Sequence, residues 1–217
     1  MGSGDTLLTY PARQPAIDAT FVLAHGAGAP QQSAFIVGFA RGLAQRGLDV
    51  LTFNFPYMQQ RRRVPDKTAI LDASYRDAVV AARDRFRRDT LFIGGKSMGG
   101  RIATYLAAAE DAITLGIGGV VLLGYPLHPP GKPAQLRSAH LPHIRVPMLF
   151  VQGERDPFGT PDELRPILDT IPADVTLHAV IGADHSLTPP KRSGTDPATV
   201  YADIQGVIAR WIAAKSS

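Results

Sequence analysis

The chain of 217 residues contains no cysteine, which excludes disulfide bonds, thiolate nucleophiles and cysteine-ligated metals. It also lacks any apolar run approaching the roughly 20 residues that a transmembrane helix needs. Its first residues show no basic segment followed by an apolar one, the pattern that marks a secretory signal. From these absences we expect a cytoplasmic protein that does not enter a membrane.

The charge is weakly basic, with 23 lysines and arginines against 19 acidic residues. Residues 61–63 (RRR) and 83–88 (RDRFRR) hold much of the surplus, but no stripe of stacking aromatic residues accompanies them. His140 and His143 are separated by Pro142 and one further residue, and no adjacent carboxylate completes a ligand set. We therefore expect no nucleic-acid partner, no metal site and no cofactor.

The size and composition are those of an ordinary globular protein. Hydrophobic residues make up 45% of the chain and charged residues 19%. A chain of this length can bury one sizeable core and is short for two domains. No repeat or long linker divides it, so we predict a single domain over residues 1–217.

Short apolar runs alternate with amphipathic segments along the chain. Strands are expected over residues 6–10, 20–24, 49–55, 91–94, 119–123, 146–152 and 175–180, and helices over 33–45, 68–87, 98 onward, 161–170 and 197–214. Residues 56–66 and 127–143 are expected to be irregular because they are rich in polar residues and proline. This alternation predicts an α/β fold with a mostly parallel, doubly wound sheet of about seven strands and helices on both faces.

The most informative stretch is residues 95–99 (GKSMG), a G-x-S-x-G pentapeptide. An apolar strand precedes it and a helix follows, which places Ser97 in a sharp turn between them. Such a turn strains the serine backbone, exposes the hydroxyl above the sheet edge and needs glycines where side chains would collide. Because glycine and serine are common, the alternative is a Gly-rich turn with a solvent-exposed serine.

Two more candidates follow predicted strands at the same edge of the sheet, where functional groups of such folds gather. The chain order Ser97, Asp156, His185 is that of nucleophile, acid and base. We expect His185 to take the serine proton and Asp156 to orient the imidazole. The alternative for Asp156 is a turn carboxylate before proline. The rival acid is Asp184, which is expected to cap its loop. The rival bases are His25 and His178, and His178 is expected to have a surface or packing role.

An acyl-transfer site also needs donors for the oxyanion and a pocket for the substrate. We expect the backbone N–H groups of Ala27, in a Gly-flanked turn, and Met98, at a helix start, to be the donors. His25, Tyr125 and His128 follow strands near the nucleophile and are expected to contact substrate. The alternatives are that His25 braces its own loop and that the other two only pack within theirs.

These motifs resemble the α/β-hydrolase superfamily over nearly the whole chain, from Thr20 to Trp211. The segments that carry the resemblance are HGAGA (25–29), FNFPY (53–57), GKSMGGR (95–101), GYPLHPPGKP (124–133), VQGERDPFG (151–159) and GADHS (182–186). The chain is most similar to small, nearly capless members related to dienelactone hydrolase and to the Tex30/KANL3-like predicted hydrolases. Dienelactone hydrolases use a cysteine nucleophile, which this chain lacks, so their particular substrate is not implied.

The resemblance and the order of the three residues imply a carboxylesterase-like serine hydrolase. It would cleave a small carboxylic ester or thioester through an acyl-enzyme, with a small-molecule acyl substrate as its partner. The connection over residues 125–146 contains five prolines, which predicts a stiff, minimal cap. Two alternatives remain at this stage: a catalytically silent scaffold for protein binding, and a related acyl-transfer activity such as perhydrolysis or peptide cleavage.

Overall fold

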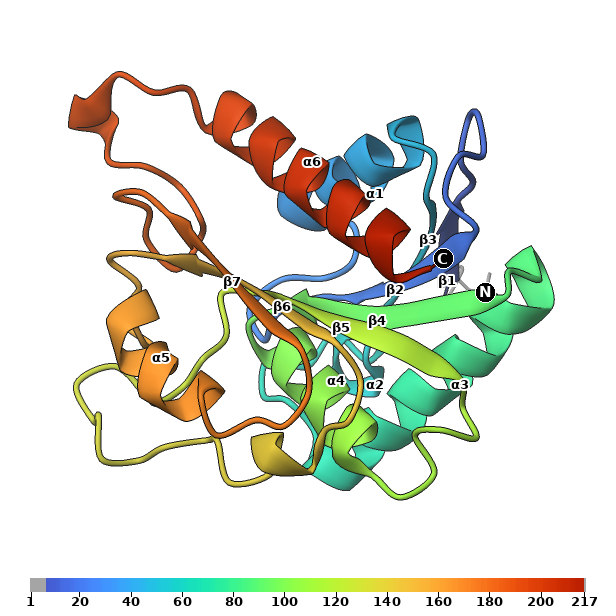
Figure 1. The fold of residues 1–217 in the computed structure, drawn as a ribbon, viewed down its shortest axis with the longest axis horizontal. Helices are drawn as coiled ribbons and strands as arrows, with labels where there is room; N and C mark the ends of the chain where they lie inside the picture. The colour runs from blue at the N-terminus through green and yellow to red at the C-terminus, as the bar shows by residue number, and fades with distance from the viewer. Residues whose placement is uncertain (1–6, 217) are drawn as a thin grey trace.

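The computed structural model describes residues 7–216, in which seven strands form one sheet in the order β1-β3-β2-β4-β5-β6-β7 (Figure 1). The strands are β1 (Leu7–Tyr10), β2 (Ala19–Ala24), β3 (Asp49–Phe53), β4 (Thr90–Lys96), β5 (Ile117–Leu123), β6 (Met148–Gly153) and β7 (Val175–Val180). The edge strand β1 is antiparallel to β3, and the other neighbouring strands are parallel. The predicted mostly parallel seven-stranded sheet is therefore confirmed.

Helices cover both faces of this sheet, as predicted. They are α1 (Ala34–Gln45), α2 (Pro56–Gln59), α3 (Thr68–Phe86), α4 (Met98–Ala108), α5 (Pro161–Leu168) and α6 (Pro197–Lys215), with 3₁₀ turns η1 (Leu141–His143) and η2 (Lys191–Ser193). Helices α1 and α6 lie over one face, and α3, α4 and α5 lie over the other (Figure 1). Strands enclosed on both sides are apolar along their length, which explains the continuous hydrophobic runs in the sequence.

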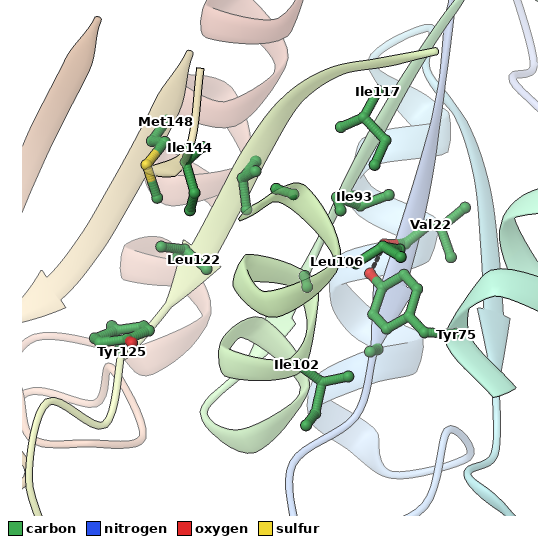
Figure 2. Close-up of a cluster of buried hydrophobic side chains, with 14 of the residues drawn as sticks. Val22, Tyr75, Ile93, Ile102, Leu106, Ile117, Leu122, Tyr125, Ile144 and Met148 are labelled. Carbon is green, nitrogen blue, oxygen red and sulfur yellow. Dashed lines mark hydrogen bonds between the residues drawn. The ribbon is translucent and has the colours of Figure 1, made fainter. Parts of the chain in front are cut away.

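The alternation of side chains along each strand divides the interior into two cores. In β2, Val22 faces the core beneath α3 and α4, whereas Phe21 and Leu23 face the core beneath α1 and α6. Figure 2 shows the first core, where Ile102 and Leu106 of α4 pack over the strands. Fully burying one such aliphatic side chain contributes about 1.5–3 kcal/mol.

Tyr75 of α3 ties this core to the central strands. Its ring is fully buried, and its hydroxyl lies 2.8 Å from the carbonyl oxygen of Val22 and 2.6 Å from that of Gly94 (Figure 2). The same hydroxyl accepts the N–H of Gly94 at 2.8 Å. Gly94 cannot carry a side chain, because a Cβ there would stand 1.9 Å from the carbonyl oxygen of Val121. Helix α3 is thus fixed to β4 just before the turn that holds Ser97.

Two expectations are corrected at the end of β3 and in the segment after it. Residues 56–66 were expected to be irregular, but α2 begins at Pro56. Proline suits a first helical position because its missing N–H would have no intrahelical acceptor there and its φ is already helical. Strand β3 also ends at Phe53 instead of continuing to Phe55, whose N–H binds the ring of His25. Residue 6, the expected start of the first strand, lies outside the described residues.

The connection from β5 to β6, residues 124–147, is fully described and contains only the turn η1. It is folded on itself: the hydroxyl of Tyr125 donates to the carbonyl of Arg137 at 2.5 Å, and the N–H of Arg137 donates to Leu127 at 2.8 Å. No inserted helix rises from this connection over the sheet edge, so the predicted minimal cap is present.

Candidate active site

Ser97 occupies the sharp turn between β4 and α4. Its φ of 51° and ψ of −114° are strained values for a residue with a side chain. The turn is held on both sides, because the N–H of Ser97 donates to Leu123 at 3.0 Å and its carbonyl accepts the N–H of Arg101 at 3.0 Å. The backbone energy stored here is offset by the hydrogen bonds to the neighbouring strand and helix.

The flanking glycines of the pentapeptide are required by close backbone approach. A Cβ on Gly95 would lie 2.4 Å from the carbonyl oxygen of Ala24, and a Cβ on Gly99 would lie 2.5 Å from that of His25. Both clashes are with backbone at the end of β2 and the residue after it, which cannot move aside easily. The glycines therefore allow the turn to dock against the neighbouring strand, as the motif predicts.

Three side chains from three strand ends form a continuous hydrogen-bonded chain. The Oγ of Ser97 lies 2.9 Å from Nε2 of His185, and Nδ1 of His185 lies 2.8 Å from Oδ2 of Asp156. With the ring proton on Nδ1, the imidazole donates to the carboxylate and accepts from the hydroxyl. The ring of Phe158 packs on the imidazole with centroids 4.2 Å apart. The structure thus brings together the three residues that the chain order singled out.

The carboxylate of Asp156 is only 1% exposed and is held by further donors. Its Oδ1 accepts the N–H of Phe158 at 2.8 Å, and its Oδ2 accepts a side-chain N–H of Gln152 at 2.9 Å. Gln152 is fully buried and also donates to the carbonyl of Gly159 at 2.6 Å while accepting the N–H of Tyr125 at 2.8 Å. Sequence reasoning missed Gln152, although a polar side chain in an otherwise apolar strand was a signal.

The rival acid Asp184 is engaged in its own loop. Its Oδ1 accepts the N–H groups of Ser186 at 2.8 Å and of Thr188 at 3.2 Å, which is the capping arrangement expected from the sequence. The rival base His178 lies within β7, where burial lowers its pKa. Neither takes part in the hydrogen-bonded chain.

A cavity of about 730 Å³ opens beside Ser97. Its wall includes His185 and both predicted oxyanion donors, together with an apolar set made up of Phe35, Ile36, Leu71, Phe158 and Tyr201. The volume is within the range of sites for small organic molecules, and a mostly apolar wall with a few polar groups is typical of them.

The predicted donors Ala27 and Met98 lie on this wall. Met98 is the first residue of α4, so its N–H has no acceptor within the helix. The peptide group that carries the Ala27 N–H includes the carbonyl of Gly26, which lies 2.7 Å from Nδ1 of His25. The hydroxyl of Tyr57 donates to the next carbonyl, that of Ala27, at 3.0 Å. Burial, with the charge of Asp66, raises the pKa of Tyr57 to about 12, which keeps the hydroxyl protonated as a donor. Tyr57 is a second residue that sequence reasoning missed.

His25 lies behind the cavity and not on its wall. Its side chain is fully buried, with Nδ1 2.7 Å from the carbonyl oxygen of Gly26 and Nε2 accepting the N–H of Phe55 at 3.1 Å. Burial lowers its pKa, so the ring is neutral and can offer one donor and one acceptor. This position favours the alternative that His25 braces the turn that carries Ala27 over the prediction that it contacts substrate.

Tyr125 and His128 are likewise absent from the cavity wall. Tyr125 is 1% exposed, and its hydroxyl donates to the carbonyl of Arg137 within the same connection. His128 is 5% exposed and bridges the carbonyl oxygen of Pro129 at 2.9 Å and the carboxylate of Glu163 on α5 at 3.2 Å. Both therefore pack the connection after β5, which favours the packing alternative over the expectation that they contact substrate.

Lys96, the residue before Ser97, also lies on the cavity wall. Its ammonium donates to the carbonyl of His185 and lies 5.9 Å from the ring of Phe35. Burial lowers its pKa to about 8, although the charges of Asp156 and Asp184 act in the opposite direction. Lys96 thus ties the end of β4 to the loop that carries the imidazole.

Within residues 7–216, no three His, Asp or Glu side chains gather as a possible metal site. In the same part of the chain, no helix combines the length and the apolar character needed to cross a bilayer.

Several solved structures share this architecture. An α/β serine hydrolase homologue from Coxiella burnetii matches with a TM-score of 0.73 at 15% identity, over 94% of this chain and 89% of its own. A lidless α/β serine hydrolase from Xanthomonas campestris matches with a TM-score of 0.70 at 20% identity, over 94% and 88%. A dienelactone hydrolase from Anabaena variabilis matches with a TM-score of 0.70 at 19% identity, over 94% and 90%. At these identities the likeness establishes the fold.

The sequence itself gives the family. The family model described as "Alpha/beta hydrolase domain" matches residues 17–213, from just before β2 to the end of α6. Since the match spans nearly all of the chain and the fold agrees with it, this protein belongs to the α/β-hydrolase family.

Proposed function

We propose that this protein is a serine hydrolase that cleaves a small carboxylic ester or thioester through an acyl-enzyme. The observation that carries the proposal is the unbroken hydrogen-bonded chain from Ser97 through His185 to Asp156, with Ser97 in a strained turn at the cavity wall. Ser97 combines positive φ with a ψ of −114°, which lies outside the left-handed helical region that Arg87 occupies, and such strain is typical of functional sites.

The distances support the following mechanism. As Ser97 attacks the acyl carbon, Nε2 of His185 accepts its proton, and Asp156 stabilises the imidazolium that forms. His185 then gives this proton to the departing alcohol or thiol, which leaves an acyl group on Ser97. A water molecule attacks that ester in turn, with His185 as its base, and the products are a carboxylic acid and the regenerated serine.

Charge develops on the carbonyl oxygen in both tetrahedral intermediates. Ala27 and Met98 line the cavity together with Ser97, and their backbone N–H groups would donate to this oxyanion. His25 holds the carbonyl of the peptide that carries the Ala27 N–H, Tyr57 holds the following carbonyl, and α4 holds the peptide of Met98. Neither donor would therefore have to reorganise during the reaction. Fixed donors of this kind are worth about 3–4 kcal/mol each where one has been removed.

Labelling with a fluorophosphonate probe tests the proposal directly, because only an activated serine reacts. We expect stoichiometric labelling that peptide mapping places on Ser97, and turnover of p-nitrophenyl acetate and butyrate. Ser97→Ala should abolish both while the circular dichroism spectrum is unchanged. Ser138→Ala, which removes a serine hydroxyl outside the cavity wall, is the matched control and should label normally.

The alternatives give different results in the same experiment. A folded protein that neither labels nor turns over any ester or thioester would overturn the proposal and favour a silent scaffold. Labelling at Ser97 without ester or thioester turnover would favour a related acyl transfer, such as peptide cleavage or perhydrolysis.

A further inference from the structure

Two arginines share the wall of the cavity with Ser97. Arg101 lies on α4, four residues after Ser97, and the two are joined by a backbone hydrogen bond of 3.0 Å. Residues four apart lie on the same helix face, so Arg101 of α4 is a neighbour of Ser97. The guanidinium carbon of Arg101 lies 5.9 Å from the ring centroid of Tyr105. Arg137 reaches the same cavity from the connection between β5 and β6.

Within residues 7–216 neither arginine forms an ion pair with a carboxylate, whereas other half-buried arginines do. Arg76 and Arg88, each 27% exposed, each bind two aspartates. In contrast, Nε of Arg101 is shielded from solvent and has no hydrogen-bond partner. The guanidinium of Arg137 donates one long hydrogen bond, of 3.5 Å, to the carbonyl of Pro126.

The acidic residue on the cavity wall does not compensate this pair. Asp66 forms an ion pair with Arg62 at 2.5 Å, so its negative charge is balanced by a cation other than Arg101 and Arg137. Burial and the charge of Arg101 lower the pKa of Arg137. Burial and the same charge also lower the pKa of His140 to about 4. Two cations that pair with no carboxylate within residues 7–216 are unfavourable in a partly desolvated cavity until an anion binds them.

We propose that Arg101 and Arg137 form a subsite for an anionic group, a carboxylate or a phosphate, carried by the substrate within a few bonds of the carbonyl that Ser97 attacks. Guanidinium groups bind both anions bidentately, which fixes orientation as well as adding affinity. The subsite would select acidic esters or thioesters over neutral ones. The ester or thioester part of this substrate rests on the proposed hydrolase function. Binding of the anionic group by the two arginines does not depend on that function.

A matched pair of substrates measures the selectivity. Wild type should hydrolyse the mono-p-nitrophenyl ester of adipate with a higher kcat/KM than p-nitrophenyl hexanoate, its neutral counterpart. Arg101→Gln and Arg137→Gln should each lower the ratio of the two kcat/KM values by about tenfold to a hundredfold, the usual worth of a hydrogen bond to a charged group. Arg41→Gln removes the same charge from the exposed side of α1 and should keep the ratio. A wild-type preference for the hexanoate, or a ratio that neither arginine changes, would overturn the subsite.

A binding experiment separates this subsite from catalysis. Calorimetry with Ser97→Ala would use adipate, inorganic phosphate and neutral hexanamide as probes. Adipate binding that Arg101→Gln or Arg137→Gln removes supports a carboxylate subsite, and phosphate binding with the same dependence supports a phosphate subsite. If neither anion binds more tightly than hexanamide, the inference fails. Anion binding by a protein that no fluorophosphonate labels would overturn the hydrolase and leave the subsite standing.

Discussion

Gln152 and His185 meet on a single oxygen of Asp156. The side-chain amide of Gln152 donates to Oδ2 at 2.9 Å, and Nδ1 of His185 lies 2.8 Å from the same atom. The amide arrives from within β6, and the imidazole arrives from the loop after β7. The orientation of the acid is therefore set by a residue inside the sheet as well as by the imidazole that it serves.

Replacing Gln152 with leucine should impair both stability and turnover. The change leaves the N–H of Tyr125, the carbonyl of Gly159 and one site on Asp156 without their buried partner. Such losses cost about 1–3 kcal/mol, so urea unfolding should show a drop of that size. Because Asp156 would also be less fixed, kcat for p-nitrophenyl acetate should fall more than KM changes. Gln135→Leu, at an exposed glutamine, is the control and should change neither stability nor kcat. If Gln152→Leu loses stability but keeps its kcat, Gln152 does not position Asp156.

The two candidate acids can be separated by one substitution each. Asp156→Asn leaves the shape of the site but removes the charge and favours the wrong tautomer of His185, a change worth on the order of 10⁴ in kcat in the best-studied triad. Asp184→Asn keeps a side-chain oxygen for the N–H groups of Ser186 and Thr188, so its kcat should fall by far less. Steady-state kinetics on one ester give both values. The opposite ranking would transfer the acid to Asp184.

The three residues of the hydrogen-bonded chain could be predicted because each follows a strand at the same sheet edge, so local patterns and topology were enough. Gln152 and Tyr57 were missed because their roles depend on partners from other elements, which strand periodicity does not specify. His25, Tyr125 and His128 were placed on the pocket wall because they also follow strands. In the structure their rings turn inward, where carbonyl, N–H and carboxylate partners are available. A residue's position just after a strand predicts at which edge of the sheet it lies, but it does not predict the direction of its side chain.

The space around two helical glycines predicts that alanine will lower stability at Gly99, in the turn after Ser97, and raise it at Gly38. Gly99→Ala would place a methyl group 2.5 Å from the backbone oxygen of His25, so the turn must shift, and such overpacking costs about 1–3 kcal/mol. Gly38 lies on the exposed side of α1, where a methyl group would meet no atom within 4 Å, and Gly38→Ala should stabilise by about 0.5–1 kcal/mol. Thermal and urea unfolding of the two variants measure both changes. Equal effects would show that the backbone at Gly99 is more adaptable than the distances indicate.

Lys96 should make stability depend on pH in a narrow alkaline window. Burial lowers its pKa from an ordinary 10.5 to about 8. Between these values the folded protein releases the proton while the unfolded chain keeps it, so the unfolded state binds more protons. The free energy of unfolding must then rise with pH across this window, and below pH 8 folding bears the full cost of burying the ammonium.

Lys96→Met removes this titration, while the other groups still titrate in both proteins. The unfolding free energy of wild type minus that of Lys96→Met should therefore rise by about 1–3 kcal/mol from pH 8 to pH 10.5, since one pKa unit corresponds to about 1.36 kcal/mol. Loss of the contact to the carbonyl of His185 adds an offset, but an offset does not change the slope. Urea unfolding at intervals of half a pH unit gives the curve. Lys132→Met, at an exposed lysine, should run parallel to wild type. A Lys96→Met curve that is also parallel would mean that the ammonium remains hydrated in the folded protein.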